Sequence, residues 1–136
     1  MPNANGTTND FSVFGASTNY QAVDELDSDS DTTYVHASTL LDKELYGMEQ
    51  VSASAAVTDV FGVKIDAMSR KDSAGGNALK LISELNGTEV SSTTKTIDTS
   101  YAIVSHVFET KPGGGNWSLA DVSAMKSGFG IVSTNA

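Results

Sequence analysis

Apolar and polar residues alternate along several short stretches of this chain, which is the spacing of a β-strand with one buried face. The clearest example is residues 61–70. One side of this stretch carries Phe61, Val63, Ile65 and Ala67, and the other carries Lys64, Asp66, Met68 and Arg70. Stretches rich in β-branched, aromatic or aliphatic residues predict further strands at residues 19–23, 32–38, 45–48, 79–85, 89–92 and 129–133.

Residues 100–109 predict a strand that is apolar on both faces. One face carries Tyr101, Ile103, Ser105 and Val107, and the other carries Ala102, Val104, His106 and Phe108. Strands with two apolar faces are typical of the middle of a sheet, where each face is covered. We therefore expect residues 100–109 to form a central strand.

Turn and helix signals separate these strands. Asn86-Gly87 predicts a tight hairpin, because both central residues of a type I′ turn need positive φ. Ser118 followed three residues later by Asp121 is a capping box and predicts one short helical turn from Ser118 to Met125. Together the elements predict an all-β fold, an antiparallel β-sandwich that is jelly-roll-like.

The first 17 residues differ from the rest in composition. They are rich in Asn, Gly, Thr and Ser, and Phe11, Val13 and Phe14 are their only large apolar residues. This composition predicts an extended N-terminal arm at residues 1–17 outside the packed core, followed by one sandwich domain at residues 18–136. The three apolar residues are candidate anchors on a partner. We expect no secretory signal, because no basic segment precedes an apolar run.

Charge narrows the class of partner. The chain holds 8 Lys and Arg against 17 Asp and Glu, for a net charge of −9, and residues 1–42 hold seven of the acids and no base. Nucleic-acid binding needs clustered basic residues, so it is not expected. No apolar run approaches the length of a membrane span, so a membrane partner is not expected either. The acidic segment is either a solvated face or an interaction segment.

The residues needed for catalysis are scarce. There is no Cys, and His36 and His106 are the only histidines. His106 falls inside a predicted strand, where a structural role is commoner than a general base. Neither a G-x-S-x-G nucleophile elbow nor a P-loop occurs. The sequence therefore predicts a protein that is not an enzyme and that has no cofactor.

One pattern suits a metal ion. Asp27, Asp29 and Asp31 alternate in an acidic stretch, and carboxylates in such a loop can converge on Ca²⁺. The stretch is not an EF-hand, because Thr32 and Ser38 occupy the positions that need Gly and Glu. A bare acidic loop and a calcium site both remain open.

Trp117 is the only tryptophan and follows a Gly-rich loop. An exposed Trp can stack on a sugar ring, which makes it a candidate carbohydrate-binding residue. The alternative is that the indole closes one end of the sandwich and donates its N–H to a nearby carbonyl.

Several segments in order resemble a group of small virion structural proteins of tailed bacteriophages. The resemblance covers about residues 18–132. The segments are DTTYV at 31–35, LY at 45–46, VKIDAMSRK at 63–71 with AG at 74–75, LKL at 79–81, SY at 100–101, FETKP at 108–112, and WS at 117–118 leading through DV at 121–122 to Gly128.

The resemblance implies a jelly-roll-like β-sandwich with a structural role and no catalytic residues. We expect a decoration (cement) protein that binds the major capsid protein or other virion subunits and stabilises the capsid surface. Such a protein is expected to form homo-oligomers, with a trimer among the options. The alternatives are a carbohydrate-binding module on a tail or fibre, and an accessory subunit of the tail or baseplate.

Overall fold

Antiparallel strands in three sheets are the main secondary structure of the computed structural model, which describes residues 1–24, 31–51, 59–72 and 76–133. The largest sheet has the order β1 (Pro2–Asn9), β4 (Lys43–Met48), β10 (Lys126–Ser133), β6 (Asn77–Leu85) and β7 (Thr88–Ser91), with β8 (Lys95–Thr96) also paired to β6. The two smaller sheets are β2 (Ser12–Phe14) with β3 (Tyr34–His36), and β5 (Val63–Ser69) with β9 (Ala102–Phe108). The helical elements are the 3₁₀ turn η1 (Tyr20–Ala22) and the helix α1 (Leu119–Ala124).

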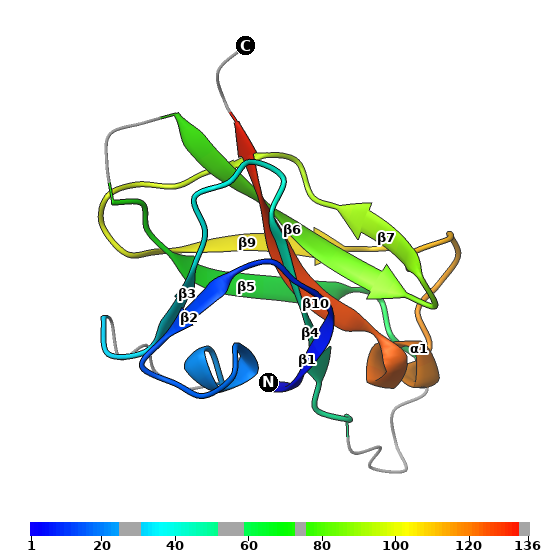
Figure 1. Ribbon diagram of the computed structural model, residues 1–136. Helices are drawn as coiled ribbons and strands as arrows, with labels where there is room; N and C mark the ends of the chain where they lie inside the picture. Colours follow the sequence, from blue (N-terminus) through cyan, green and yellow to red (C-terminus); the bar gives the residue numbers. More distant parts are fainter. Residues whose placement is uncertain (25–30, 52–58, 73–75, 134–136) are drawn as a thin grey trace.

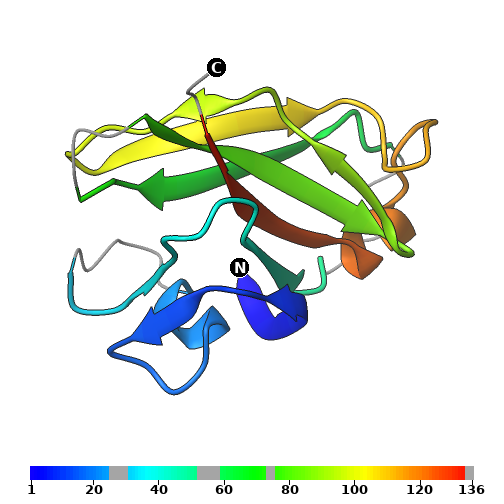
Figure 2. The same ribbon diagram turned by 45° about the horizontal axis from the view of Figure 1, so that its top comes forward.

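The sheets are arranged as a sandwich, which confirms the predicted fold class. β5 and β9 run side by side across β6, as both views show (Figures 1 and 2). The N-terminal strands β1 and β2 lie at the other side of the molecule, in the lower part of Figure 2. The pair β5–β9 therefore forms an outer layer of the fold.

A core cluster joins the layers. Its buried members are Leu85, Phe108, Trp117 and Met125. Val60, Val63, Ile65 and Val122 pack against it from partly buried positions. Val63 and Ile65 belong to the predicted inner face of residues 61–70, so that face is confirmed within β5, whereas Phe61, which precedes the strand, is 88% exposed.

Local signals fix the turn after β6 and the fit of β10. Asn86 and Gly87 have φ values of 52° and 81°, and β7 returns alongside β6 from this turn, as the sequence predicts. Gly128 lies in β10 between β4 and β6. A Cβ at this position would lie 1.8 Å from the carbonyl oxygen of Glu44, so only glycine allows this approach of the strands.

The helical turn also forms where it was predicted. The Ser118 hydroxyl accepts a hydrogen bond from the backbone N–H of Asp121 at 3.1 Å, and the Asp121 carboxylate accepts one from the Ser118 N–H at 2.9 Å. This reciprocal pair completes the capping box and begins α1 at Leu119.

The N-terminal segment is extended, but the structure does not leave it outside the packed part of the chain. β1 pairs antiparallel with β4 at the edge of the large sheet, with irregular register. Phe11 packs edge-on against Phe129 of β10, with ring centroids 5.3 Å apart. The polar composition of residues 1–17 did not predict the pairing of β1 with β4. An edge strand forms its backbone hydrogen bonds whatever its side chains are.

Two strand predictions need correction. Residues 19–23 contain the 3₁₀ turn η1 instead of a strand, and the Asn19 side chain donates to the Phe11 carbonyl at 2.8 Å, which favours a turn. Residues 100–109 do form β9, but β9 is not central. Within the described residues it pairs only with β5, and Ile103 keeps 61% of its surface exposed.

Candidate functional site

The outer face of the β5–β9 pair carries an exposed set of apolar side chains. Three cross-strand rows of antiparallel partners form this face: Lys64 with Val107, Asp66 with Ser105, and Met68 with Ile103. We call these six residues the outer face. Its apolar members Met68, Ile103 and Val107 are 46%, 61% and 49% exposed. Strand side chains that face solvent are usually polar, so this face is suited to contact with another surface.

The charges on the outer face compensate each other. The Lys64 ammonium lies 3.0 Å from the Asp66 carboxylate, and both side chains are about half exposed. The Ser105 hydroxyl also donates to Asp66. This hydrogen bond and the ammonium of Lys64 hold the pKa of Asp66 below its usual value. The face is therefore neutral as a unit, although the whole chain carries −9.

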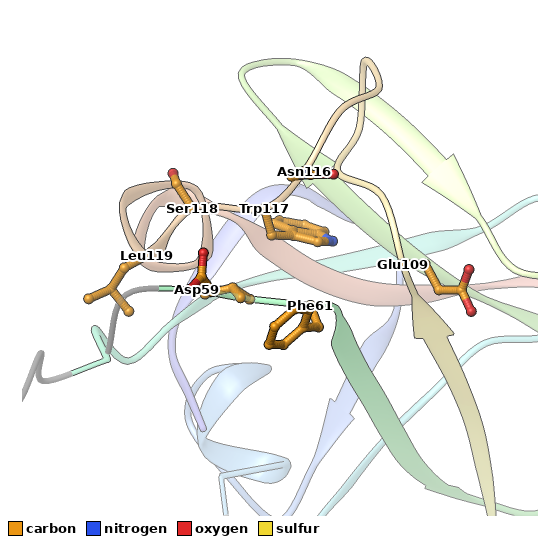
Figure 3. Close-up of a pocket in the computed structure, with 8 residues that line it drawn as sticks. Asp59, Phe61, Glu109, Asn116, Trp117, Ser118 and Leu119 are labelled. Atoms are coloured by element: carbon orange, nitrogen blue, oxygen red, sulfur yellow. The ribbon is translucent and has the colours of Figure 1, made fainter. Parts of the chain in front are cut away.

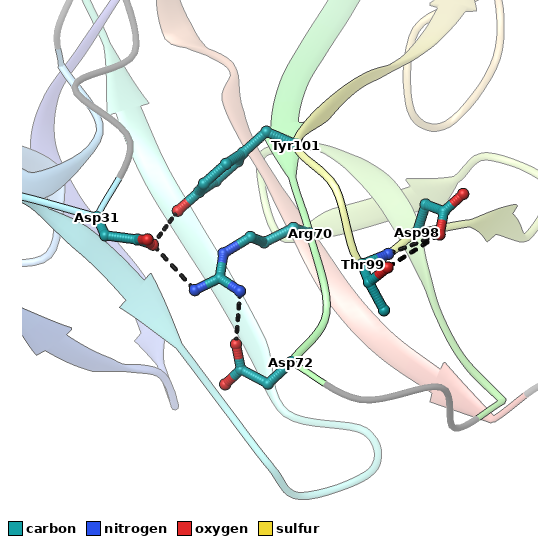
Figure 4. Close-up of polar contacts among 6 residues, drawn as sticks. All are labelled: Asp31, Arg70, Asp72, Asp98, Thr99 and Tyr101. Carbon is teal, nitrogen blue, oxygen red and sulfur yellow. Dashed lines mark hydrogen bonds and ion pairs between the residues drawn. The ribbon is translucent and has the colours of Figure 1, made fainter.

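A polar cluster borders one end of the outer face (Figure 4). The Asp31 carboxylate accepts a hydrogen bond from the Tyr101 hydroxyl at 2.7 Å and from the Arg70 guanidinium at 2.9 Å. Arg70 also pairs with Asp72 at 3.0 Å and lies over the Tyr101 ring, 5.2 Å from its centroid. The Asp98 carboxylate, also drawn in Figure 4, accepts a hydrogen bond from the backbone N–H of Thr99 at 2.7 Å. The cluster thus ties the segment before β3 to the ends of β5 and β9.

Asp31 is the only one of the three proposed calcium ligands that falls within the described residues, because Asp27 and Asp29 lie outside them. The hydrogen bonds from Tyr101 and Arg70 lower the pKa of Asp31. A calcium ion would have to compete with the guanidinium for the same carboxylate. In the described part of the chain, no three His, Cys, Asp or Glu side chains gather in a group that could hold a metal ion.

Trp117 is buried, with only 4% of its surface exposed. Its indole N–H donates to the Phe108 carbonyl at 2.8 Å, which is the structural alternative foreseen for this residue. The indole face is not open to a sugar ring. The prediction that Trp117 is a stacking platform for a sugar is therefore wrong.

A hollow of about 230 Å³ nevertheless lies beside Trp117 (Figure 3). Its lining includes Asp59, Asn116 and Phe61, and the Phe61 side chain is 88% exposed. The carboxylate of Glu109, another lining residue, points away from the other side chains in Figure 3. The exposed aromatic ring at this end of the sandwich is therefore Phe61, which the sequence placed on the inner face of its strand.

The three proposed arm anchors have different surroundings. Phe11 is partly buried against Phe129, and Val13 is partly buried in β2, opposite Val35. Phe14 is 52% exposed and stacks on Tyr34 with ring centroids 4.9 Å apart. Of the three, Phe14 offers the most surface to a partner.

A buried carboxylate lies beneath the N-terminal segment. Glu44 of β4 is 0% exposed. Its Oε2 accepts the backbone N–H of Phe11 at 3.1 Å, and Oε1 has no hydrogen-bond partner among the described residues. Burial raises the pKa of Glu44 to about 7, against the opposing hydrogen bonds from Phe11 and Asn19. Nothing in the sequence marks this Glu, because its burial results from the docking of the N-terminal segment.

Each of the two histidines lies beside an aromatic ring. His36 lies in β3 beside Tyr34, with ring centroids 5.8 Å apart. His106 lies in β9 and packs edge-on against Phe108 at 4.7 Å. Each ring thus has an aromatic neighbour, the packing role expected for His106.

In the part of the chain that the structure describes, no helix has the length and apolar character to cross a membrane.

Comparison with known proteins finds no matching family model, no matching curated protein and no matching solved structure. The function considered below therefore rests on the residues and geometry of this chain.

Proposed function

We propose that this chain is a structural virion protein of a tailed bacteriophage, which decorates the capsid and stabilises it through non-covalent contacts. The observation that carries the proposal is the outer face of β5–β9, where Met68, Ile103 and Val107 remain exposed. A sequence that is apolar on both faces of β9 is suited to a strand covered on both sides. A neighbouring subunit would supply the missing cover.

The segments that resemble phage virion proteins have architectural roles in this fold. Asp31, Arg70 and Tyr101 join three parts of the chain in one cluster. Trp117 bonds β9, and Ser118 caps α1. Residues that serve the architecture and no reaction are what a structural subunit requires, so their positions favour a contact role over catalysis.

Stabilisation of the capsid would follow from mass action. A subunit that binds the assembled shell and not its separated parts lowers the free energy of the assembled state. Burial of apolar side chains such as Ile103 supplies the driving force, at about 25 cal/mol per Å² of apolar surface. The acidic segment at residues 1–42 would face solvent or a basic patch on the shell.

Labelling of intact particles tests this function. Virions of the phage that carries the gene are purified and probed with a gold-conjugated antibody against this chain. Label spread over the capsid supports the decoration role, and label confined to the tail moves the protein to the tail or baseplate. Virions that contain none of the chain by mass spectrometry and immunoblotting contradict a virion role.

A carbohydrate-binding module is the second candidate, and Phe61 is the observation that favours it. The ring is 88% exposed beside a hollow lined by Asp59 and Asn116, and aromatic rings with amide and carboxylate neighbours suit sugar hydroxyls. A glycan array with the wild-type chain and Phe61→Ala tests this candidate. Binding that Phe61→Ala abolishes supports it, and a wild-type chain that binds no glycan contradicts it.

A further inference from the structure

We infer that the outer face of β5–β9 is a self-association surface, which packs face to face against the same surface of a second copy of this chain. This inference does not depend on a virion role. It names the face used and the partner that occupies it.

The first argument is the mismatch between the sequence of β9 and its surroundings. Val104 and Phe108 belong to the inner face, and Phe108 is buried in the core. Ile103 and Val107 belong to the outer face and are 61% and 49% exposed. A strand needs only one apolar face when the other meets water. The second apolar face therefore indicates a cover that the described residues of one copy do not supply.

The second argument is charge. Two copies with a net charge of −9 repel each other over most of their surfaces. On the outer face Lys64 and Asp66 cancel. Two copies that meet at this face therefore bring no net charge of the face together.

The third argument is self-complementarity. Lys64 and Asp66 occupy adjacent rows of the same strand on the same face. A two-fold axis between these rows brings Lys64 of each copy opposite Asp66 of the other, because a two-fold contact pairs each residue reciprocally. The same axis sets the Val107 row against the Ser105 row. Both charges then gain a partner across the contact.

The size of the face predicts a weak contact. Each strand has seven residues, so the face is about 23 Å long and about 10 Å wide, which is about 230 Å² per copy. Stable interfaces bury about 800 Å² per partner. The contact alone is thus expected to be reversible and dependent on concentration, as suits subunits that are gathered on a larger assembly.

Sedimentation velocity of the full chain, from about 10 µM to about 1 mM, tests the inference over the range of dissociation constants of weak contacts. The wild type is expected to shift from monomer to dimer. Ile103→Asp is expected to weaken dimerisation at least about tenfold, because it places a carboxylate where the outer face has its most exposed apolar side chain. Val90→Asp is the matched control, since Val90 is an exposed strand residue of β7 and the charge change is the same.

Charge reversal provides a second measurement that does not rely on one variant. Lys64→Asp alone and Asp66→Lys alone each place like charges opposite each other and are expected to remain monomeric. Their equimolar mixture restores opposite charges and is expected to dimerise. Circular dichroism melts establish that each variant is folded.

A wild-type chain that stays monomeric at about 1 mM overturns the inference, because a dissociation constant above this value corresponds to less than about 4 kcal/mol of binding free energy. In that case the face is left to a different protein. Dimerisation that Ile103→Asp leaves unchanged, or a mixture that stays monomeric, also overturns it.

Discussion

Glu44 predicts an unusual dependence of stability on pH. Its side chain is fully buried and its pKa is raised from the ordinary 4.5 to about 7, mainly because burial disfavours the ionised form. The unfolded chain releases this proton near pH 4.5 and the folded chain near pH 7. Protonation of Glu44 therefore contributes its full stabilisation of the folded chain below pH 4.5. This contribution is lost as the pH rises through 7.

The magnitude follows from the two pKa values. The interval from 4.5 to about 7 corresponds to about 3 kcal/mol at 1.36 kcal/mol per pH unit. The ionised form is costly because Oε1 has no hydrogen-bond partner among the described residues, and neither has the hydroxyl of Tyr46, two residues along the same face of β4. Glu44→Gln keeps an oxygen for the Phe11 N–H. It removes the charge without changing the shape.

Urea unfolding between pH 5 and pH 8.5 measures the effect. Trp117, which is unique and buried, supplies the fluorescence signal. The wild type is expected to lose about 2.5 kcal/mol of its free energy of unfolding across this range relative to Glu44→Gln, since the loss runs from pH 5 to about 7 at 1.36 kcal/mol per unit. Asp31, Asp66 and Asp121 do not contribute, because their pKa values are lowered and the stability they confer is lost only in more acidic solution.

Glu84→Gln is the matched control. Glu84 is also buried, but it pairs with Lys126, and that ion pair together with the Gly87 N–H outweighs burial and lowers the pKa of Glu84. Loss of its charge is expected to destabilise the fold by about 3 kcal/mol at pH 8, because Lys126 is left without its partner. Parallel pH profiles for the wild type and Glu44→Gln would refute the reasoning about Glu44.

Three further substitutions test the packing. Trp117→Phe removes the indole hydrogen bond and leaves a small cavity, so thermal melting by circular dichroism should show a loss of about 2–3 kcal/mol; an unchanged melt counts against this anchor. Ser118→Ala removes the helix cap and should cost about 1 kcal/mol in the same assay, whereas no loss would show that the capping box adds nothing. Gly128→Ala drives a Cβ into a backbone carbonyl and should cost more than about 4 kcal/mol in urea unfolding. Its control is Gly113→Ala, at a position with φ of 87° and no atom within 4 Å of the added Cβ, which should cost about 1 kcal/mol. Equal losses for the two variants contradict the close approach of the strands.

The elements that the sequence predicted well are those with local causes. The alternation in β5, the Asn86-Gly87 turn and the capping box before α1 each involve residues close in the chain, so their patterns survive in the fold. β1 was missed as a sheet strand because its residues show no alternation. It forms because β4 offers a free edge, and Gly6 fits there since a Cβ would lie 2.4 Å from the Leu45 carbonyl oxygen.

The candidate site could be predicted only in part. The sequence separated the two faces of β9 correctly, with Ile103 and Val107 together on one of them. It could not show that this face stays uncovered, because cover depends on where other elements pack. The same limit applies to Trp117 and Phe61, whose burial and exposure depend on the core around β9 and α1.

The proposed role of this chain as a capsid decoration protein is tested most directly by adding it back to particles that lack it. Particles from a phage with the gene deleted are mixed with the purified chain, and the copies bound per particle and the temperature of DNA release are measured. The account predicts saturable binding at a fixed number of copies, with DNA release at a higher temperature, and weaker binding by Ile103→Asp than by Val90→Asp. Particles that bind no chain, or that release DNA at an unchanged temperature when saturated with it, would contradict the account.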